Sequence, residues 1–172
     1  MLFCLEKTRA PEFFAISPVL SEEPQSTTMI SSAQAPPSTI FAFGISVAIV
    51  ADGMGGHSSG EVASSLAVKV TRDKFGSMRN TGLKPGAYND KFALETNQLG
   101  FAVQLANSVI YETGNSAPEN KGMGTTLSAI LLVGGKISIV HIGDSRVYLF
   151  RDGVLQQVTE DHSLVMEHVR KG

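Results

Sequence analysis

The chain has 172 residues, of which 42% are hydrophobic, enough for one domain with a substantial core. Its 14 basic and 16 acidic residues give a net charge of -2, which excludes the basic surface expected of a protein that binds nucleic acid or an anionic membrane. Cys4 is the only cysteine, so an intrachain disulfide and a zinc–thiolate cluster are both excluded.

The first 39 residues differ in composition from the rest of the chain. They hold five of the seven prolines, and the first glycine is Gly44. Residues 17–39 are mostly Ser, Thr, Pro, Gln and Glu, which cannot bury enough surface to offset the entropy lost on ordering. We therefore expect residues 1–39 to be irregular or disordered and residues 40–172 to form the globular part.

Two segments bear on the location of the protein. The apolar start of the chain has no basic residue before it and ends at Glu6, so we expect no signal peptide. The longest apolar run, residues 40–51, is shorter than the roughly 20 residues that span a bilayer. With one thiol, which fits a reducing compartment, these features predict a cytoplasmic protein without a membrane partner.

The middle of the chain predicts buried strand followed by two helices. Residues 40–51 are rich in Ile, Val and Phe and predict one or two buried strands. Ser58 and Glu61 have the spacing of a capping box, and apolar residues then recur at helical spacing to about Phe75. Residues 76–89 are punctuated by glycine and predict a loop. Residues 90–113 predict a second helix, with Gly114 just beyond its end.

After Gly124 the hydrophobic pattern changes to that of strands. Residues 125–133 and 136–142 predict two strands joined by a turn at Gly134-Gly135. Residues 146–150 and 154–158 predict a second hairpin around Asp152-Gly153, and residues 159–169 the opening of a helix. Strands that follow a helix pair indicate an α+β fold with an antiparallel sheet.

Asp52 stands where an apolar strand meets a glycine-rich turn. An acid at this position commonly accepts hydrogen bonds from turn amides. Alternatively, the Asp52 carboxylate and the Gly53 carbonyl can bind a divalent cation, because hard cations prefer oxygen ligands and glycine lets the backbone come close. Asp144, in the sequence Gly-Asp-Ser, offers the same choice between a turn residue and a metal ligand, with Arg146 either paired to it or solvated.

The four histidines allow different roles. His57 could act as an acid or a base near neutral pH, or be a polar loop residue before a helix. His141 lies within an apolar strand and predicts a buried, hydrogen-bonded histidine, whereas His162 and His168 predict surface residues of the last helix.

A rival pattern occurs at residues 56–60, which read Gly-His-Ser-Ser-Gly. This matches the nucleophile elbow of serine esterases, with Ser58 as nucleophile and Asp144 and His162 following in the required order. Two observations oppose it: residues 52–55 separate the strand end from the motif, and the downstream hairpins disagree with a parallel hydrolase sheet. Ser58 also suits a helix cap.

Three stretches together resemble the bacterial metal-dependent Ser/Thr protein phosphatases of the PPM, or type 2C, family. They are VADGMGGH (50–57) with GEVAS (60–64), GMGTT (122–126), and IGDSR (142–146), and the segment TEDHS (159–163) is similar as well. The resemblance covers residues 40–172. It implies an αββα sandwich of two antiparallel sheets flanked by helices, incomplete in this chain.

The resemblance also implies a chemistry. The family hydrolyses phosphoserine and phosphothreonine with two Mn²⁺ or Mg²⁺ ions and a bridging water that attacks phosphorus in line. By this resemblance Asp52 bridges the metals, the Gly53 carbonyl binds one through water, and Asp144 serves a further, weaker site. Thr125 and Thr126 look like scaffold. The implied partners are a phosphorylated protein and a Ser/Thr kinase.

The chain departs from the family pattern at both ends. Family members carry an arginine and a Glu-Asp pair on their first strand, and the sequence around Arg9 does not match that pattern. The later Asp-Gly and Asp-Asn motifs of the family do not occur before Gly172. One strong carboxylate compensates the repulsion between two cations poorly. We therefore expect a fragment or degenerate member with little activity. The alternatives are a pseudophosphatase that binds a phosphoprotein or kinase, and a serine esterase.

Overall fold

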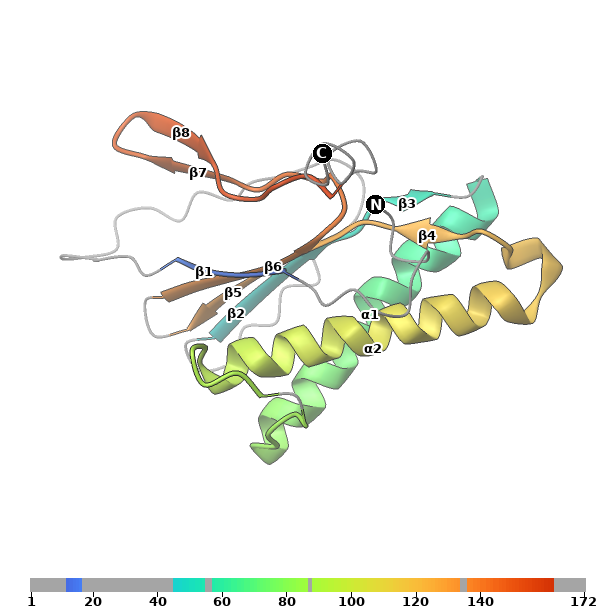
Figure 1. Cartoon of the computed structure of the whole chain (residues 1–172), viewed down its shortest axis with the longest axis horizontal. Coiled ribbons are helices and arrows are strands. Elements are labelled where there is room, and N and C mark those ends of the chain that lie inside the picture. The colour runs from blue at the N-terminus through green and yellow to red at the C-terminus, as the bar shows by residue number, and fades with distance from the viewer. Residues whose placement is uncertain (1–11, 17–44, 55–56, 87, 134–135, 163–172) are drawn as a thin grey trace, which may run out of the picture.

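The computed structural model describes residues 12–16, 45–54, 57–86, 88–133 and 136–162, with backbone alone for residues 12–16, 57 and 58. These residues form helices and antiparallel strands, which confirms the predicted α+β class. Helices α1 (His57–Thr81) and α2 (Leu94–Ser116) cover one side of a four-stranded sheet. Figure 1 shows strands β7 (Tyr148–Arg151) and β8 (Val154–Gln157) on the other side of that sheet.

The four-stranded sheet has the order β1-β6-β5-β2, and each neighbouring pair is antiparallel. Its strands are β1 (Glu12–Ile16), β2 (Ile45–Val50), β5 (Leu127–Val133) and β6 (Lys136–Ile142). Alternate residues of a strand face opposite sides, so one set of positions in β2, β5 and β6 faces the helices. That set supplies the sheet's share of the core: Val47, Leu127, Ala129, Leu131 and Val140.

Two short strands extend this sheet toward one end. Strands β3 (Gly53–Met54) and β4 (Gly124–Thr125) pair with each other, and β4 follows the 3-10 turn η1 (Pro118–Asn120). Their pairing continues the register of β2 and β5, since Val50 lies opposite Ser128 and Gly53 opposite Thr125. The antiparallel ladder is therefore interrupted only at Ala51 and Asp52.

The helix pair supplies the other half of the core through apolar residues that recur at helical spacing. The buried members of this set are Ala63, Ala67, Phe75, Leu99, Ala102, Val103, Ala106 and Ile110. The small residues among them let the two helices approach each other closely. Burial of this continuous apolar surface is the main force that holds the helix layer against the sheet.

Helix α1 runs one and a half turns further than predicted, because Gly82 and not Gly76 ends it. Gly82 has a φ of +64°, its N–H donates to the Arg79 carbonyl, and the Leu83 N–H donates to the Met78 carbonyl. This is a Schellman motif, which requires a residue that tolerates positive φ. Gly76 stays helical because the turn after it is held by the fully buried Met78.

Helix α2 begins later and ends later than residues 90–113. The Asn97 side chain holds the preceding loop: its Oδ1 accepts from the Asn89 N–H at 2.8 Å, and its Nδ2 donates to the carbonyls of Asn89, Phe92 and Ala93. These bonds keep residues 89–93 out of the helix. Gly114 lies inside the helix, buried, so its predicted place beyond the helix end is wrong.

The prediction that residues 1–39 are irregular differs from the structure at β1. Residues 12–16 read EFFAI and pair with β6, from Glu12 opposite His141 to Ile16 opposite Ile137. Aromatic and β-branched residues favour strands, and a composition averaged over 39 residues conceals such a short run. The other residues of that segment lie outside the described ones.

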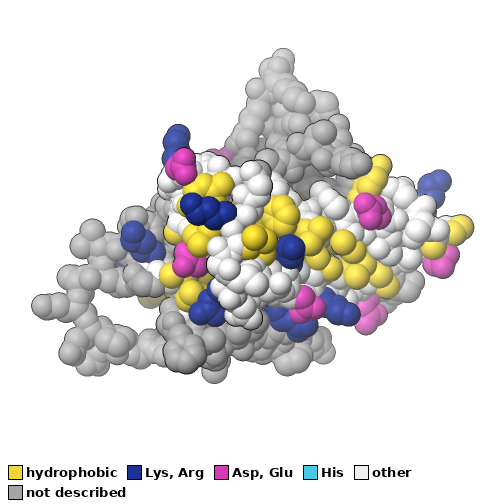
Figure 2. All heavy atoms as spheres, turned by 90° about the horizontal axis from the view of Figure 1, so that it is seen from below, with side chains coloured by type: hydrophobic (Ala, Val, Ile, Leu, Met, Phe, Trp, Pro, Cys, Tyr) yellow, Lys and Arg dark blue, Asp and Glu magenta, His cyan; other side chains and the backbone are white. Residues whose placement is uncertain are grey.

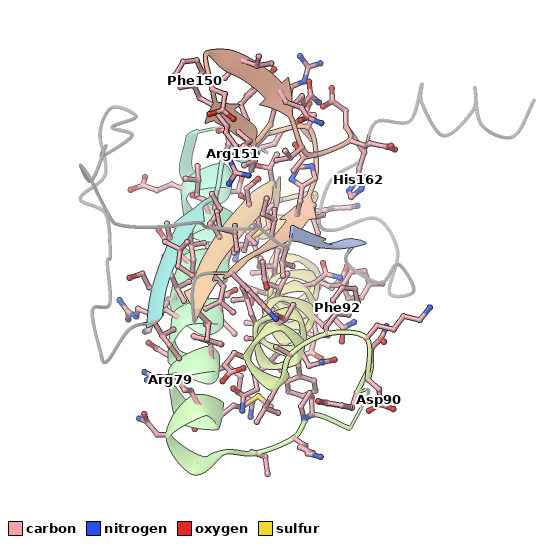
Figure 3. The ribbon with its side chains drawn as sticks, turned by 90° about the vertical axis from the view of Figure 1, so that its left-hand side faces the viewer. Arg79, Asp90, Phe92, Phe150, Arg151 and His162 are labelled. Atoms are coloured by element: carbon pink, nitrogen blue, oxygen red, sulfur yellow. The ribbon has the colours of Figure 1, made fainter. Side chains whose placement is uncertain are left out.

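Both predicted hairpins are present. Strands β5 and β6 pair from Leu127 opposite Ile142 to Val133 opposite Lys136; the turn between them lies outside the described residues. At the β7–β8 turn, Asp152 and Gly153 have φ values of 52° and 75°. These suit the tight turn that an Asp-Gly pair favours. Figure 3 shows this hairpin, marked by Phe150 and Arg151, at the end of the molecule opposite the α1–α2 connection.

The helix predicted for residues 159–169 is absent from the four of its residues that the structure describes. Residues 159–162 are not helical, and residues 163–169 lie outside the described part of the chain. None of the described helices is both long and apolar enough to cross a membrane. On the helix side of the molecule, Figure 2 shows positive and negative side chains scattered around a band of hydrophobic ones, without a patch of one sign.

Candidate metal centre

Asp52 lies at the interruption of the ladder, directly after β2. Its side chain is exposed, and none of the described residues hydrogen-bonds or ion-pairs with the carboxylate. Its backbone is held firmly. The Asp52 N–H donates to Thr126 Oγ1 at 3.2 Å, and the Asp52 carbonyl accepts from the Thr126 N–H and from Thr125 Oγ1, both at 2.9 Å. A hydrogen-bonded backbone thus presents a carboxylate that has no partner among the described residues.

Gly53 follows Asp52 at a point where the first turn of α1 comes against β3. A Cβ added to Gly53 would collide with the carbonyl group of Gly60, and a Cβ on Gly60 would lie 2.9 Å from the Gly53 carbonyl oxygen. Both positions therefore require glycine for reasons of space. This contact brings the start of α1 against the residue that follows Asp52.

Asp144 lies in the turn that follows β6, and it is exposed like Asp52. The residue before it, Gly143, has a φ of +106°, and a Cβ there would lie 2.8 Å from Thr126 Cγ2. The residue after it, Ser145, has its hydroxyl 2.7 Å from Thr126 Oγ1. Asp144 is thus presented between two residues that contact Thr126, the same side chain that holds Asp52.

His141 is fully buried, and both of its ring nitrogens are hydrogen-bonded, as predicted. Its Nε2 donates to the Gly143 carbonyl at 3.0 Å, because a carbonyl only accepts. The Ser128 hydroxyl lies 3.0 Å from His141 Nδ1 and 3.1 Å from the Ser145 carbonyl, and it has one proton to give. Burial, and next the nearby His162, lower the pKa of His141. Burial thus disfavours the charged form of the ring.

We expect the free energy of unfolding to fall as the pH drops below about 6.5, the ordinary histidine pKa. Below that pH the unfolded chain binds a proton that folded His141 resists, so stability present above pH 6.5 is lost on acidification. Urea unfolding between about pH 7.5 and 5.5, where carboxyl groups titrate little, measures the effect. In His141→Gln, the free energy of unfolding should depend less steeply on pH over this range. Equal slopes in the two proteins would contradict this account.

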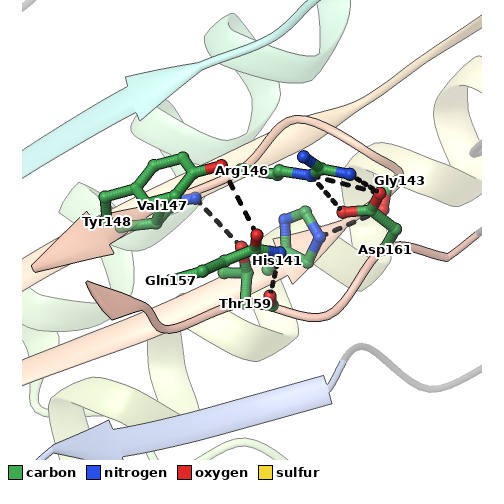
Figure 4. Close-up of polar contacts among 8 residues, drawn as sticks. All are labelled: His141, Gly143, Arg146, Val147, Tyr148, Gln157, Thr159 and Asp161. Atoms are coloured by element: carbon green, nitrogen blue, oxygen red, sulfur yellow. Dashed lines mark hydrogen bonds and ion pairs between the residues drawn. The ribbon is translucent and has the colours of Figure 1, made fainter. Parts of the chain in front are cut away.

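The residues after β8 fold back onto the turn that carries Asp144 (Figure 4). Arg146 pairs with Asp161, through Nε to Oδ1 at 2.9 Å and Nη2 to Oδ2 at 2.7 Å. These hydrogen bonds lower the pKa of Asp161. The Val147 N–H donates to Thr159 Oγ1 at 2.9 Å. The sequence left Arg146 either paired with Asp144 or solvated; its partner is Asp161 and not Asp144, and its side chain remains exposed.

His162 is buried, which corrects its prediction as a surface residue. Its ring Nδ1 accepts from the Gly143 backbone N–H at 3.3 Å, and its backbone N–H donates to the Gly143 carbonyl at 2.7 Å. Its ring centroid lies 5.1 Å from that of His141. It closes over Gly143 because residues 159–162 are an extended segment and not the first turn of a helix. Figure 3 shows it at the end of the described chain, beside the sheet.

Two further predicted residues lie at the start of α1. His57 is the first residue of that helix, and Ser58 the second; their side chains lie outside the description. The sheet tests the esterase alternative through its topology, since every described strand pair is antiparallel. The nucleophile elbow of an esterase belongs to a parallel sheet, so the fold disfavours Ser58 as a nucleophile.

The described residues offer oxygen donors of the type that hard divalent cations prefer. Asp52 and Asp144 present exposed carboxylates, and cations such as Mg²⁺ are often held by one or two carboxylates while keeping several waters. In number the donors are few: within the described residues, no three His, Cys, Asp or Glu side chains form a metal-binding group. The described residues thus offer oxygen donors of the kind that Mn²⁺ and Mg²⁺ prefer.

Sequence reasoning missed the residues that join these two carboxylates. Thr126 and Ser145 link the turn of Asp52 to the turn of Asp144, yet both were read as ordinary scaffold or turn residues. A signal for Thr126 exists in the pattern: extending the β2–β5 register past Val50 places it opposite Asp52. No comparable signal joins Arg146 to Asp161, because that pair depends on how the chain folds back after β8.

Comparisons with known proteins identify the family of the chain. The family model described as Protein phosphatase 2C matches residues 39–170. The serine/threonine protein phosphatase PstP of Mycobacterium tuberculosis is 43% identical over 123 residues, which are 72% of this chain and 22% of PstP. The serine/threonine phosphatase stp of Listeria monocytogenes is 40% identical over 126 residues, which are 73% of this chain and 47% of stp.

Solved structures give the same result. The crystal structure of M. tuberculosis PstP/Ppp has a TM-score of 0.56 and 34% identity, covering 94% of this chain and 59% of that one. The PstP catalytic domain in complex with two manganese ions has the same TM-score and identity, covering 94% and 60%. This chain spans less than half the length of PstP and of stp. The matched model covers most of the chain, which therefore belongs to the protein phosphatase 2C family, in its bacterial PPM form.

Proposed function

We propose that this chain takes part in the metal-dependent hydrolysis of phosphoserine and phosphothreonine in proteins. Asp52 and the Gly53 carbonyl would hold the two Mn²⁺ or Mg²⁺ ions, and Asp144 a third, weaker one. The observation that carries this proposal is the Asp52 carboxylate, exposed and unpaired among the described residues on a backbone fixed by three hydrogen bonds. A relative, PstP, has been crystallised with two manganese ions.

Each residue of the centre would have a separate task. When bound, the ions supply an acidified water and neutralise phosphoryl charge. The Asp52 carboxylate would hold them at the end of the sheet, where the phosphoprotein can approach from solvent. Asp144, exposed beside Gly143, would offer a second carboxylate to the same region. His57 would hold the proton that the leaving serine or threonine oxygen takes up.

The partners follow from this chemistry. The substrate is a phosphorylated protein, and the enzyme that forms it is a Ser/Thr kinase, which makes a kinase the natural functional partner. A cytoplasmic location agrees with the single thiol, which fits a reducing compartment. Nucleic acid and membrane are not proposed as partners.

The proposal is tested with the purified chain and a phosphothreonine peptide. We expect slow release of phosphate with Mn²⁺, none with EDTA, and recovery when excess Mn²⁺ is added back. Phosphate release that EDTA leaves unchanged would contradict the proposal. Ester hydrolysis that is indifferent to EDTA and lost in Ser58→Ala would instead support the esterase.

A second candidate function is a phosphoprotein-binding module without turnover. It is favoured by the small number of metal donors, since no three candidate ligands cluster within the described part of the chain. Isothermal titration with the same phosphopeptide separates the two candidates. Binding of the peptide without release of phosphate, in saturating Mn²⁺, would identify the binding module.

A further inference from the structure

The backbone opposite Asp52 departs from an ordinary antiparallel ladder. In such a ladder, two residues that face each other as a hydrogen-bonded pair exchange both of their N–H and carbonyl groups. Here the Thr126 N–H donates to the Asp52 carbonyl at 2.9 Å, as expected. The return bond is different: the Asp52 N–H donates to Thr126 Oγ1 at 3.2 Å. A side-chain hydroxyl has taken the place of a backbone carbonyl.

Another hydroxyl lies within reach of the displaced carbonyl of Thr126. Thr125 Oγ1 lies 2.9 Å from the Thr126 carbonyl and 2.9 Å from the Asp52 carbonyl, and its one proton can go to either. The two threonines therefore supply hydroxyl partners at the one position where the ladder opens. The opening falls at Asp52, whose carboxylate is exposed and has no partner among the described residues.

The same Thr126 hydroxyl reaches the second carboxylate turn. Thr126 Oγ1 accepts from the Asp52 N–H, so its own proton can go to Ser145 Oγ, 2.7 Å away. The Thr126 methyl group occupies the space beside Gly143, where a Cβ would come within 2.8 Å of it. Thr126 is itself buried. One side chain thus contacts the residues on both sides of Asp144 and fixes the backbone of Asp52.

We propose that Thr126 is the positioning residue of the metal centre, coupling the Asp52 turn to the Asp144 turn through its hydroxyl. This inference rests on the proposed function, because it assigns Thr126 a role toward the ions that Asp52 and Asp144 would hold. Partners that orient a metal ligand commonly change metal affinity about 10–100-fold when they are removed. The hydroxyl is the group at issue, since valine keeps the shape of threonine and removes only the hydrogen bonds.

The test compares Thr126→Val with Thr126→Ser and with a matched control, Thr71→Val. Thr71 is also buried, and its hydroxyl has no hydrogen-bond partner among the described residues. It lies within α1, about 21 Å of helix from His57 at 1.5 Å per residue. The readouts are the Mn²⁺ dissociation constant, from the electron paramagnetic resonance signal of free Mn²⁺, and phosphate release.

We expect Thr126→Val to raise the Mn²⁺ dissociation constant about 10–100-fold, with Thr126→Ser and Thr71→Val near the wild type. Wild-type affinity in Thr126→Val, or equal losses in Thr126→Val and Thr126→Ser, would overturn the inference and leave the proposed function standing. No Mn²⁺ binding by the wild type would overturn both. If Thr126→Val does not fold, Ser145→Ala decides. It removes the far end of the same link, and unchanged affinity there would equally overturn the inference.

Discussion

Replacing Asp52 with asparagine is expected to lower Mn²⁺ affinity and Mn²⁺-dependent phosphate release by at least about a hundredfold each. Removing a residue that orients a metal ligand already lowers metal affinity about 10–100-fold, so removing a direct carboxylate ligand should lower it further. The melting temperature should hardly change, because the Asp52 side chain is exposed and no described residue pairs with it. The backbone bonds to Thr125 and Thr126 do not involve the carboxylate.

A matched control is Asp152→Asn in the β7–β8 turn. Asp152 is also exposed, and its φ of 52° is one that asparagine tolerates well. This variant makes the same change of charge without touching the candidate centre, so Mn²⁺ affinity and phosphate release should match the wild type. Equal effects of Asp52→Asn and Asp152→Asn would show that Asp52 contributes only to the general charge of the surface.

Replacing Gly53 with alanine is expected to lower the free energy of unfolding by about 2–3 kcal/mol, the upper part of the usual range for overpacking. The added methyl group would meet the Gly60 carbonyl, which is backbone within α1 and cannot move aside as a flexible side chain could. Relief requires α1 to shift away from β3. The change should therefore also weaken Mn²⁺ binding, because Asp52 is the residue directly before Gly53. Urea unfolding measures the stability and metal titration the binding.

Gly76→Ala provides the control for this substitution. Gly76 lies inside α1, and a Cβ there meets nothing within 4 Å. Alanine should stabilise the helix by about 0.5–1 kcal/mol, since glycine is the poorer helix former. The two glycines thus predict effects of opposite sign for the same change. A neutral Gly53→Ala would mean that the contact between β3 and α1 relaxes without cost.

Much of the fold follows from local patterns in the sequence. The switch from helical to alternating periodicity after Gly124 predicts β5 and β6, and Asp152-Gly153 predicts the turn that is found. The end of α1 was predicted too early because Gly76 and Gly82 are equally good candidates for the glycine that ends the helix. The positive φ of Gly82 and the hydrogen bonds of the Schellman motif show that Gly82 ends the helix.

Long-range pairing is where prediction from local pattern fails. Strand β1 exists because β6 offers it an edge, and nothing in residues 12–16 identifies that partner. The carboxylates of the candidate centre were found because each follows an apolar strand and precedes or follows glycine. The link between them was not, since the contact of Thr126 with Ser145 joins two turns that are adjacent only in the folded chain.

The shared register of the two strand pairs makes the candidate centre sensitive to chain length. Because β3–β4 continues the pairing of β2–β5, the residue count between Val50 and Gly53 alone sets which side of the sheet Asp52 faces. One residue inserted there would turn the carboxylate to the opposite face or break the alignment of Gly53 with Gly60. Substitutions at Ala51 should be tolerated far better than any insertion or deletion beside it.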